Sequence, residues 1–166
     1  SVLNKLLEQR AYTDAHTGLP NKDACEVLLN NKETVAKHTA CMMFDLNNLK
    51  IINDTKGHSK GDQLILNFAR LLRNVIPQKD FVGRYGGDEF MVVIYNTSKT
   101  EIEDILKQLS REKDRLNSSG NNMPIDYACG WAISDADSEC TIQMLLDKAD
   151  YYMYENKQAY KKSKKS

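Results

Sequence analysis

The sequence predicts one α+β domain in which helices flank a mixed, mainly antiparallel sheet. Three observations support this prediction. The chain has 166 residues, which is enough for one good core. Short β-rich runs alternate with longer segments whose apolar residues recur at helical spacing. Two of the β-rich runs are separated by only the four residues GGDE, which is typical of a hairpin.

The first helix is predicted over residues 2–10, where Val2, Leu3, Leu6 and Leu7 have helical spacing. Because the chain starts inside this helix, we expect residues 1–12 to be the end of an upstream linker or signalling helix. A turn-rich connector follows. A second helix is predicted over residues 22–37. Its apolar positions are Ala24, Val27, Leu28 and Val35.

The middle of the chain is predicted to form a strand and two helices. Residues 39–45 are an apolar run that ends in an acid, which suits a buried strand. The polar segment 47–57 is expected to be a loop that runs into a short helix. The clearest helix spans residues 61–76, and Pro77 follows its end. The apolar residues of that helix are Leu64, Ile65, Phe68, Leu71, Leu72, Val75 and Ile76.

The hairpin comes next, with β-rich runs at 81–85 and 90–95. The Gly-Gly pair can supply the positive φ values of tight hairpin turns. A helix is predicted over 99–117, a loop over 118–124, a strand over 125–134 and a last helix over 141–160. The alternating residues of that strand are Ile125, Tyr127, Cys129 and Trp131. The core face of the last helix is Leu145, Leu146, Ala149, Tyr152 and Met153. The Lys-rich residues 161–166 are expected to be a disordered tail.

Composition excludes several classes of protein. The formal net charge is zero, so the whole chain gives no electrostatic argument for binding nucleic acid. No apolar run approaches the ~20 residues of a membrane span, and no signal-peptide pattern is present. The four cysteines and three histidines are scattered, which argues against a His/Cys metal site and for reduced thiols. We therefore expect a cytoplasmic domain, alone or as the cytoplasmic part of a larger sensor protein.

Three acids are candidates for a metal site. Asp45 ends the first strand, and Asp88 and Glu89 lie at the tip of the hairpin. If the hairpin pairs beside the first strand, the three carboxylates meet at one end of the sheet and repel each other. Mg²⁺ would relieve this repulsion and would take phosphate oxygens of a substrate as further ligands. The glycines would let a phosphate approach the backbone closely.

Other polar residues suit a nucleotide but also have simpler explanations. Lys50 and Lys148 can neutralise a polyphosphate. Asn53 and Asp62 can bind a purine edge, and a carboxylate that accepts from N1–H and N2–H₂ selects guanine over adenine. However, exposed lysines are common, Asn53 suits a loop or cap, and Asp62 suits the start of a helix. The hairpin acids can equally be a solvent-facing turn, so spacing alone leaves both interpretations open.

Four motifs resemble the GGDEF domain, the catalytic domain of diguanylate cyclases. RYGGDEF at residues 84–90 resembles the family signature. DAHTGLPNK at 14–22 is similar to its DxLTGLxNR motif, and residues 44–62 to its DxDxFKxINDxxGHxxGD block. KADYYMYENK at 148–157 resembles its KADxAMYxAK segment. These motifs span nearly the whole chain, and the resemblance places the domain at residues 13–160.

The resemblance implies a ferredoxin-like fold similar to the palm of nucleotidyl cyclases, with the GGDEF residues on a hairpin. It implies that two GTP molecules condense to cyclic di-GMP with release of two pyrophosphates. Asp45, Asp88 and the carbonyl of Leu46 would hold Mg²⁺ or Mn²⁺, and Glu89 would help to ready the ribose 3′-hydroxyl. The residues that would contact GTP are Asn48, Leu49, Lys50, Asn53, Asp62, Gly86, Gly87 and Lys148.

The resemblance also implies partners. One domain of the family binds one GTP, so catalysis requires a homodimer with facing sites. An upstream sensor would set the dimer geometry through residues 2–10. Two alternatives remain: a catalytically silent module that binds GTP or dimerises, and a cyclase that makes a mixed GMP–AMP dinucleotide. The intact signature argues against the first, and Asp62 argues against the second.

Several positions depart from the family pattern. His16 replaces Leu and Lys22 replaces Arg in the entry motif, and Asn47 and Leu49 replace Asp and Phe. The inhibitory product site of the family is an RxxD motif just before the hairpin. Here this window reads PQKD, with Pro77 in place of Arg and Asp80 retained. We therefore expect this product site to be absent.

Overall fold

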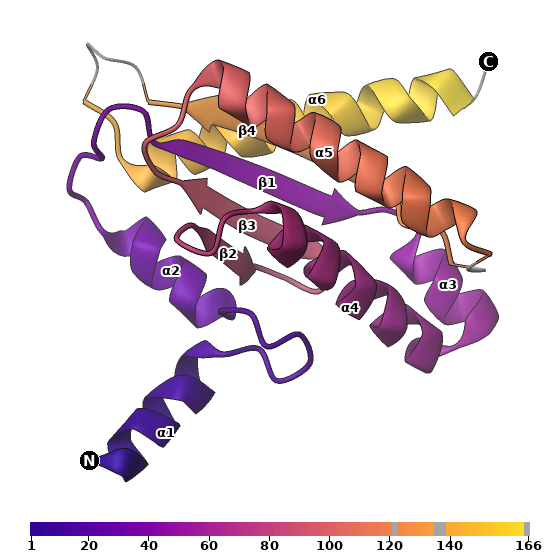
Figure 1. Cartoon of the computed structure of the whole chain (residues 1–166), viewed down its shortest axis with the longest axis horizontal. Coiled ribbons are helices and arrows are strands. Elements are labelled where there is room, and N and C mark those ends of the chain that lie inside the picture. Colours follow the sequence, from indigo (N-terminus) through magenta and orange to yellow (C-terminus); the bar gives the residue numbers. More distant parts are fainter. Residues whose placement is uncertain (121–122, 135–138, 165–166) are drawn as a thin grey trace.

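Four antiparallel strands form the centre of the computed structural model, which describes residues 1–120, 123–134 and 139–164. The strands lie in the order β2-β3-β1-β4 (Figure 1). Their bounds are β1 Ala40–Leu46, β2 Phe81–Arg84, β3 Glu89–Ile94 and β4 Tyr127–Ile133. The predicted α+β fold is confirmed, and the hairpin β2–β3 pairs beside β1 as expected.

Helices cover both faces of the sheet (Figure 1). On one face lie α4 (His58–Val75) and α5 (Lys99–Ser118), and on the other lie α2 (Lys22–Asn30) and α6 (Ile142–Lys164). The short helix α3 (Leu49–Lys56) packs on α4. The first helix, α1 (Val2–Tyr12), projects away from the sheet and has no buried residue. No helix in the described part of the chain is long and apolar enough to cross a membrane.

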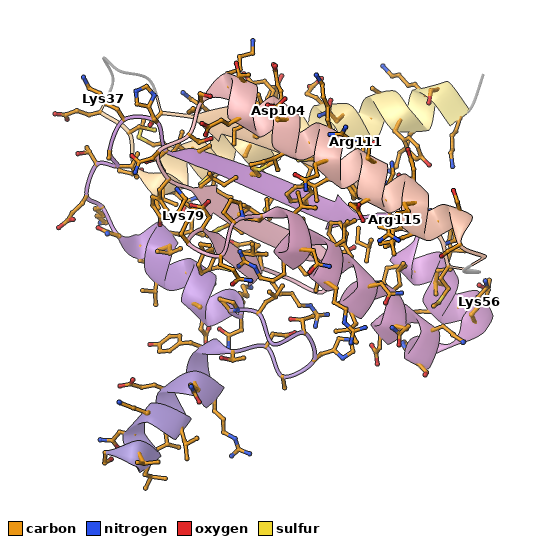
Figure 2. The ribbon with its side chains drawn as sticks, in the orientation of Figure 1. Lys37, Lys56, Lys79, Asp104, Arg111 and Arg115 are labelled. Carbon is orange, nitrogen blue, oxygen red and sulfur yellow. The ribbon has the colours of Figure 1, made fainter. Side chains whose placement is uncertain are left out.

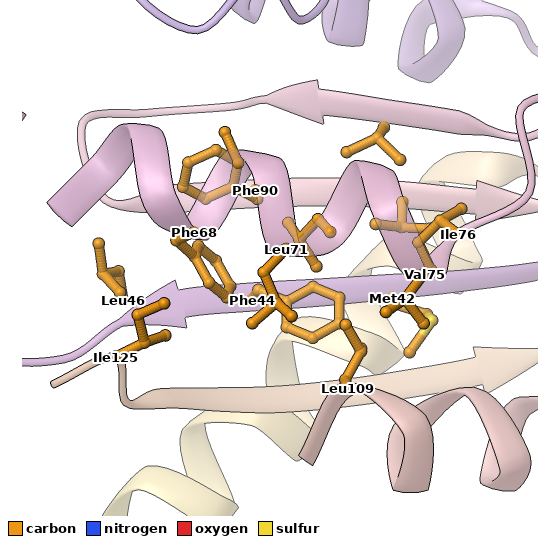
Figure 3. Close-up of a cluster of buried hydrophobic side chains, with 14 of the residues drawn as sticks. Met42, Phe44, Leu46, Phe68, Leu71, Val75, Ile76, Phe90, Leu109 and Ile125 are labelled. Atoms are coloured by element: carbon orange, nitrogen blue, oxygen red, sulfur yellow. The ribbon is translucent and has the colours of Figure 1, made fainter. Parts of the chain in front are cut away.

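An aromatic cluster anchors the strand that carries the hairpin acids (Figure 3). The ring of Phe68 on α4 lies 5.1 Å from Phe90 and 6.0 Å from Phe44, in edge-to-face geometry. Successive residues of a strand point to opposite faces. Phe90 and Phe44 therefore face α4, while their neighbours Glu89 and Asp45 face the side of α6. Core packing thus fixes the two acids on one face.

Helix α6 lies directly against the backbone of β4 at Gly130. A Cβ atom at this position would overlap the Ala149 carbonyl oxygen and the Met153 nitrogen. The neighbours of Gly130 on this face of β4 are Ala128 and Ala132, which are also small and buried. This close approach sets the position of α6 and of every side chain that α6 directs toward the end of the sheet.

Two helix predictions differ from the structure. The second helix ends at Asn30 and not at residue 37, and it buries Cys25 and Leu29 while Val27 is 57% exposed. Asn31 at the end of this helix has an extended backbone, and Val35 beyond it donates a backbone hydrogen bond to the Cys140 carbonyl. The last helix leaves Tyr152 51% exposed, so the predicted core position is wrong.

The predicted tail differs as well. Helix α6 continues to Lys164, so residues 161–164 are helical and not disordered. Residues 165–166, together with residues 121–122 of the predicted loop, lie outside the described residues.

Candidate active site

Three carboxylates meet at one end of the sheet, as the sequence predicts. Asp45 lies opposite Glu89 in the β1–β3 pair, and the Leu46 N–H donates to the Asp88 carbonyl at 2.8 Å. Asp45 is only 7% exposed, and Asp88 and Glu89 are partly buried. The strand ladder therefore fixes the backbone of all three acids before any ligand binds.

Burial and neighbouring carboxylates raise the pKa values of Asp88 and Glu89. Burial and then the charge of Asp45 raise the pKa of Asp88. Burial, followed by the charges of Asp45 and Asp88, raises the pKa of Glu89. Both carboxylates are therefore harder to ionise than in water, which means that the metal-free site is electrostatically unfavourable at neutral pH.

A lysine on α6 partly offsets this charge. The Nζ atom of Lys157 donates to Oδ2 of Asp45 at 2.6 Å. The other oxygen of Asp45, Oδ1, is buried and has no hydrogen-bond partner among the residues that the structure describes. A buried carboxylate oxygen without a partner is costly, so this atom is a candidate ligand for a cation.

A pocket of about 480 Å³ opens beside Asp88 and Leu46. One wall is the turn from β1 into α3, where Asn48 has the left-handed φ of 68°. The other wall is the last part of α6. The basic residues that line the pocket are Lys50, Lys157, Lys161 and Lys164. A pocket with four lysines next to paired carboxylates suits a polyphosphate with a divalent cation.

The hairpin turn is held by Arg84, which sequence reasoning did not single out. Its guanidinium donates to the carbonyls of Gly86 and Gly87 and forms a 3.2 Å ion pair with Asp14 of the connector. The Tyr85 N–H donates to the Glu89 carbonyl at 2.8 Å. The position of this arginine, two residues before the Gly-Gly pair in RYGGDEF, was the sequence signal that could have indicated this role.

Neither the backbone conformation nor the packing of the fold requires glycine in the turn. The prediction that Gly86 and Gly87 supply positive φ values is wrong, because the described glycines with positive φ are Gly18, Gly57 and Gly120. A Cβ atom at Gly87 would meet nothing within 4 Å, and one at Gly86 would lie 3.7 Å from the Glu89 Cβ. The turn therefore leaves room for a ligand outside the fold.

Asn53 and Asp62 also come together, at the junction of α3 and α4. A Cβ atom at Gly61 would overlap the Asn53 side-chain amide, so the absence of a side chain at Gly61 lets Asn53 lie on the first turn of α4. Asp62 is the next residue of α4, just after that turn, and its side chain is exposed. The two predicted base-binding residues are thus neighbours in space.

A comparison with protein-family models matches residues 11–163 to the family described as diguanylate cyclase, GGDEF domain. The chain belongs to the GGDEF domain family. The motifs and the geometry around Asp45, Asp88 and Glu89 agree with this assignment, and the resemblance found in the sequence is confirmed.

Curated relatives of this GGDEF domain differ in their named activities. The signaling protein YkoW of Bacillus subtilis is 31% identical over 95% of this chain, and diguanylate cyclase DgcP of Escherichia coli is 30% identical over 96%. The cyclic di-GMP phosphodiesterase PdeB of Shewanella oneidensis is 31% identical over 90%. The chain spans 20%, 48% and 18% of these three relatives, so it corresponds to one part of each.

Solved structures share the fold. A microbial GGDEF domain described with cyclic di-GMP is 26% identical, has a TM-score of 0.76, and the match covers 92% of this chain and 94% of that one. The coiled coil and GGDEF domain of DgcB from Caulobacter crescentus, in complex with cyclic di-GMP, is 24% identical with a TM-score of 0.80 over 95% of this chain and 86% of that one. The second likeness supports the fold alone.

Lys148 lies away from this site, in contrast to the prediction. It is exposed and lines a separate groove with Trp131 and Tyr152. Lys148 precedes Lys157 by nine positions on α6, which is about 13 Å along a helix. Lys157 and Lys161 line the pocket instead. Lys157 is the last residue of the closing motif KADYYMYENK, so the motif contained a second lysine that could have been predicted for this site.

The window before the hairpin is an internal turn of this GGDEF domain. Asp80 is only 4% exposed, and its Oδ1 accepts from the Tyr95 N–H at 3.0 Å. Arg73 on α4 donates to the carbonyls of Ile76 and Pro77 at 3.0 and 2.6 Å. The retained acid is therefore engaged inside the fold and not presented to solvent.

Proposed function

We propose that this GGDEF domain is a diguanylate cyclase that condenses two GTP molecules into cyclic di-GMP and releases two pyrophosphates. One observation carries the proposal: Asp45 and Asp88 lie together beside a pocket lined by four lysines. Paired carboxylates and lysines are the groups that in-line attack on an α-phosphate requires. The GGDEF family and its relatives named as diguanylate cyclases support the same activity.

The residues fit a divalent cation only as a partial shell. Among residues 1–120, 123–134 and 139–164, no group of three or more His, Cys, Asp or Glu side chains is placed to hold a metal ion. Asp45, Asp88 and the Leu46 carbonyl would hold Mg²⁺ or Mn²⁺, whose other ligands are water and phosphate oxygens. The unpartnered Oδ1 of Asp45 supports this assignment. When bound, the metal would neutralise phosphate charge and lower the pKa of the attacking hydroxyl.

The other site residues divide between the two ends of GTP. Lys50, Lys157 and Lys161 would bind the triphosphate, along the turn formed by Asn48 and Leu49 and across Gly86 and Gly87. Asn53 and Asp62 would bind guanine at the start of α4. The raised pKa of Glu89 suits a group that accepts a proton from the ribose 3′-hydroxyl.

A second domain must supply the attacking hydroxyl, because each domain binds one GTP. We infer a homodimer with two-fold symmetry and facing sites. The exposed apolar residues of α1, including Leu3, Leu6 and Leu7, support contact with a second copy or with an upstream helix. A sensor domain, in a protein located in the cytoplasm or with this part facing it, would then set the rate through α1.

Two other functions remain to be distinguished by experiment. A silent GTP-binding module is the main alternative, since relatives of similar identity include proteins named as phosphodiesterases. The intact carboxylates and the formed lysine pocket favour activity. A cyclase for a mixed GMP–AMP dinucleotide is disfavoured because Asp62 is present at the base-binding corner.

Product formation tests the proposal directly. With GTP and Mg²⁺, the purified protein is expected to form cyclic di-GMP at a rate that rises faster than linearly with enzyme concentration, because the dimer is the active species. While most of the protein is monomeric, doubling the enzyme should raise the rate about fourfold. Chromatography of the products at two enzyme concentrations measures both quantities.

The same assay distinguishes the alternatives. Binding of GTP without product, even when the domains are linked as a dimer, would support the silent module. A mixed dinucleotide formed from GTP and ATP together would show that Asp62 does not select guanine. Cyclic di-GMP alone would support the proposal.

Product inhibition through residues 77–80 is expected to be absent. Pro77 provides no guanidinium, and Asp80 is buried against the Tyr95 backbone. Adding cyclic di-GMP should therefore leave the maximal rate unchanged while GTP is saturating. Strong non-competitive inhibition that disappears in Asp80→Asn would contradict this expectation.

A further inference from the structure

The connector between α1 and α2 touches the hairpin through several contacts. Thr13 and Pro20 form an antiparallel bridge, and the Pro20 carbonyl accepts from the Arg84 N–H at 2.8 Å. Asp14 accepts from the Arg84 guanidinium, which in turn holds the carbonyls of the Gly-Gly turn. The connector is therefore fixed against the phosphate side of the candidate site.

His16 joins the same connector to the base-binding side. Its Nε2 lies 2.7 Å from the Asp62 carbonyl oxygen, across 46 positions of sequence. A carbonyl oxygen only accepts, so Nε2 must carry the hydrogen in this contact. The family pattern has leucine at this position, and leucine can make no such bond.

The side chain of Asp62 needs external positioning. It is exposed just after the first turn of α4, and no hydrogen bond to its carboxylate is seen in the described part of the chain. Asn53 packs against this turn from α3 through the space at Gly61. His16 contacts the neighbouring Asp62 carbonyl, so the connector and α3 both contact this part of α4.

We propose that His16 is a positioning residue for base recognition: by donating to the Asp62 carbonyl, it fixes the backbone of α4 at Asp62 and thereby raises affinity for guanine. This inference rests on the proposed function of Asp62. It assigns no chemical step to His16, because the imidazole contacts backbone and not the reacting atoms. The loss of His16 should therefore weaken nucleotide binding and leave the phosphate pocket unchanged.

Calorimetric titration with an unreactive GTP analogue tests the inference. In this analogue a methylene group replaces the oxygen between the α- and β-phosphates, so pyrophosphate cannot leave. His16→Leu should weaken binding of the analogue about three- to tenfold, as expected for one hydrogen bond. His16→Gln keeps an N–H donor and should restore most of the affinity. Inorganic tripolyphosphate, which lacks a base, should bind both variants as it binds the unaltered protein.

A matched control is His38→Asn, which changes an exposed histidine whose carbonyl accepts a hydrogen bond from the Thr97 N–H. His38 has a φ of 65°, a conformation that asparagine tolerates. This variant should bind the analogue normally, and all three variants should unfold within about 2 °C of each other.

The possible results of these titrations test the role of His16 separately from the proposed cyclase activity. Equal affinity of His16→Leu and the unaltered protein for the analogue would overturn the role of His16 alone. An equal loss of tripolyphosphate binding would also overturn it, because general loosening would then explain the effect. Analogue binding without cyclic di-GMP formation would refute the cyclase and leave the role of His16 standing. No binding of the analogue by the unaltered protein would refute both.

Discussion

Replacing Asp88 with asparagine is expected to lower turnover by about 1,000-fold or more, since the variant loses a carboxylate ligand for the cation. The amide has nearly the same shape, so the hairpin and the backbone bond between Leu46 and Asp88 should survive. The chemical step should therefore fail in a protein that still folds and still binds guanine at Asp62.

The same substitution is expected to stabilise the metal-free protein. Burial and the neighbouring charge of Asp45 raise the folded-state pKa of Asp88 above its ordinary value of 3.8. The folded state therefore binds the proton more tightly than the unfolded state, and the aspartate costs stability as the pH rises through the folded pKa. Asp88→Asn removes this cost, so its unfolding midpoint should exceed that of the unaltered protein at pH 7 by roughly 2–4 °C.

Thermal unfolding at two pH values, with and without Mg²⁺, checks both effects. The advantage of the variant should shrink as the pH falls through the folded pKa and vanish below 3.8, where the carboxyl is protonated in both states. Added Mg²⁺ should stabilise the unaltered protein more than the variant. Asp104→Asn is the matched control, because the Asp104 side chain points outward from α5 (Figure 2) and is exposed. Full turnover by Asp88→Asn would refute the metal assignment.

Gly130→Ala is expected to destabilise the protein by about 3 kcal/mol, the upper part of the range for overpacked sites. The new Cβ atom would overlap backbone atoms of Ala149 and Met153, which cannot rotate away as a side chain can. For a chain of this size the unfolding midpoint should fall by roughly 6–12 °C. Any displacement of α6 would also separate Lys157 from Asp45, so activity should fall in the variant even when it is folded.

Gly87→Ala provides the control for this substitution. Its Cβ atom would meet nothing within 4 Å, and Gly87 does not have a positive φ. Its unfolding midpoint should stay within about 2 °C of the unaltered protein, measured by the same thermal scan. Equal stability of Gly130→Ala and Gly87→Ala would show that α6 does not depend on close contact with β4.

Sequence reasoning located the acidic end of the site because two local signals agreed. The apolar run before Asp45 and the β-rich runs around Asp88 and Glu89 could only be strands, and adjacent strands bring their ends together. The structure adds that Phe90 lies in the core and that Glu89 lies opposite Asp45. Whether a short segment forms a strand depends on the residues next to it in the sequence, so local hydrophobic patterns predict it well.

The lysines of the site were harder to predict, because their positions depend on the rotation of α6 about its axis and on how closely α6 packs on the sheet. Lys148 and Lys157 both belong to one motif, and only the contact of α6 with β4 shows which of them faces Asp45. The rotation of α6 also explains why Tyr152, which is exposed, was wrongly predicted to lie in the core. Bonds between distant segments, such as His16 with Asp62 and Asp14 with Arg84, leave no periodic signal in the sequence at all.

The ion pair between Asp45 and Lys157 joins residues that are 112 positions apart in the sequence. During translation, Asp45 is therefore synthesised well before Lys157. The acids on β1 and β3 emerge from the ribosome before α6 exists. A nascent chain therefore carries its acidic cluster with no lysine from α6 and no phosphate pocket. The pocket beside Asp88 is therefore complete only after α6 has docked on β4.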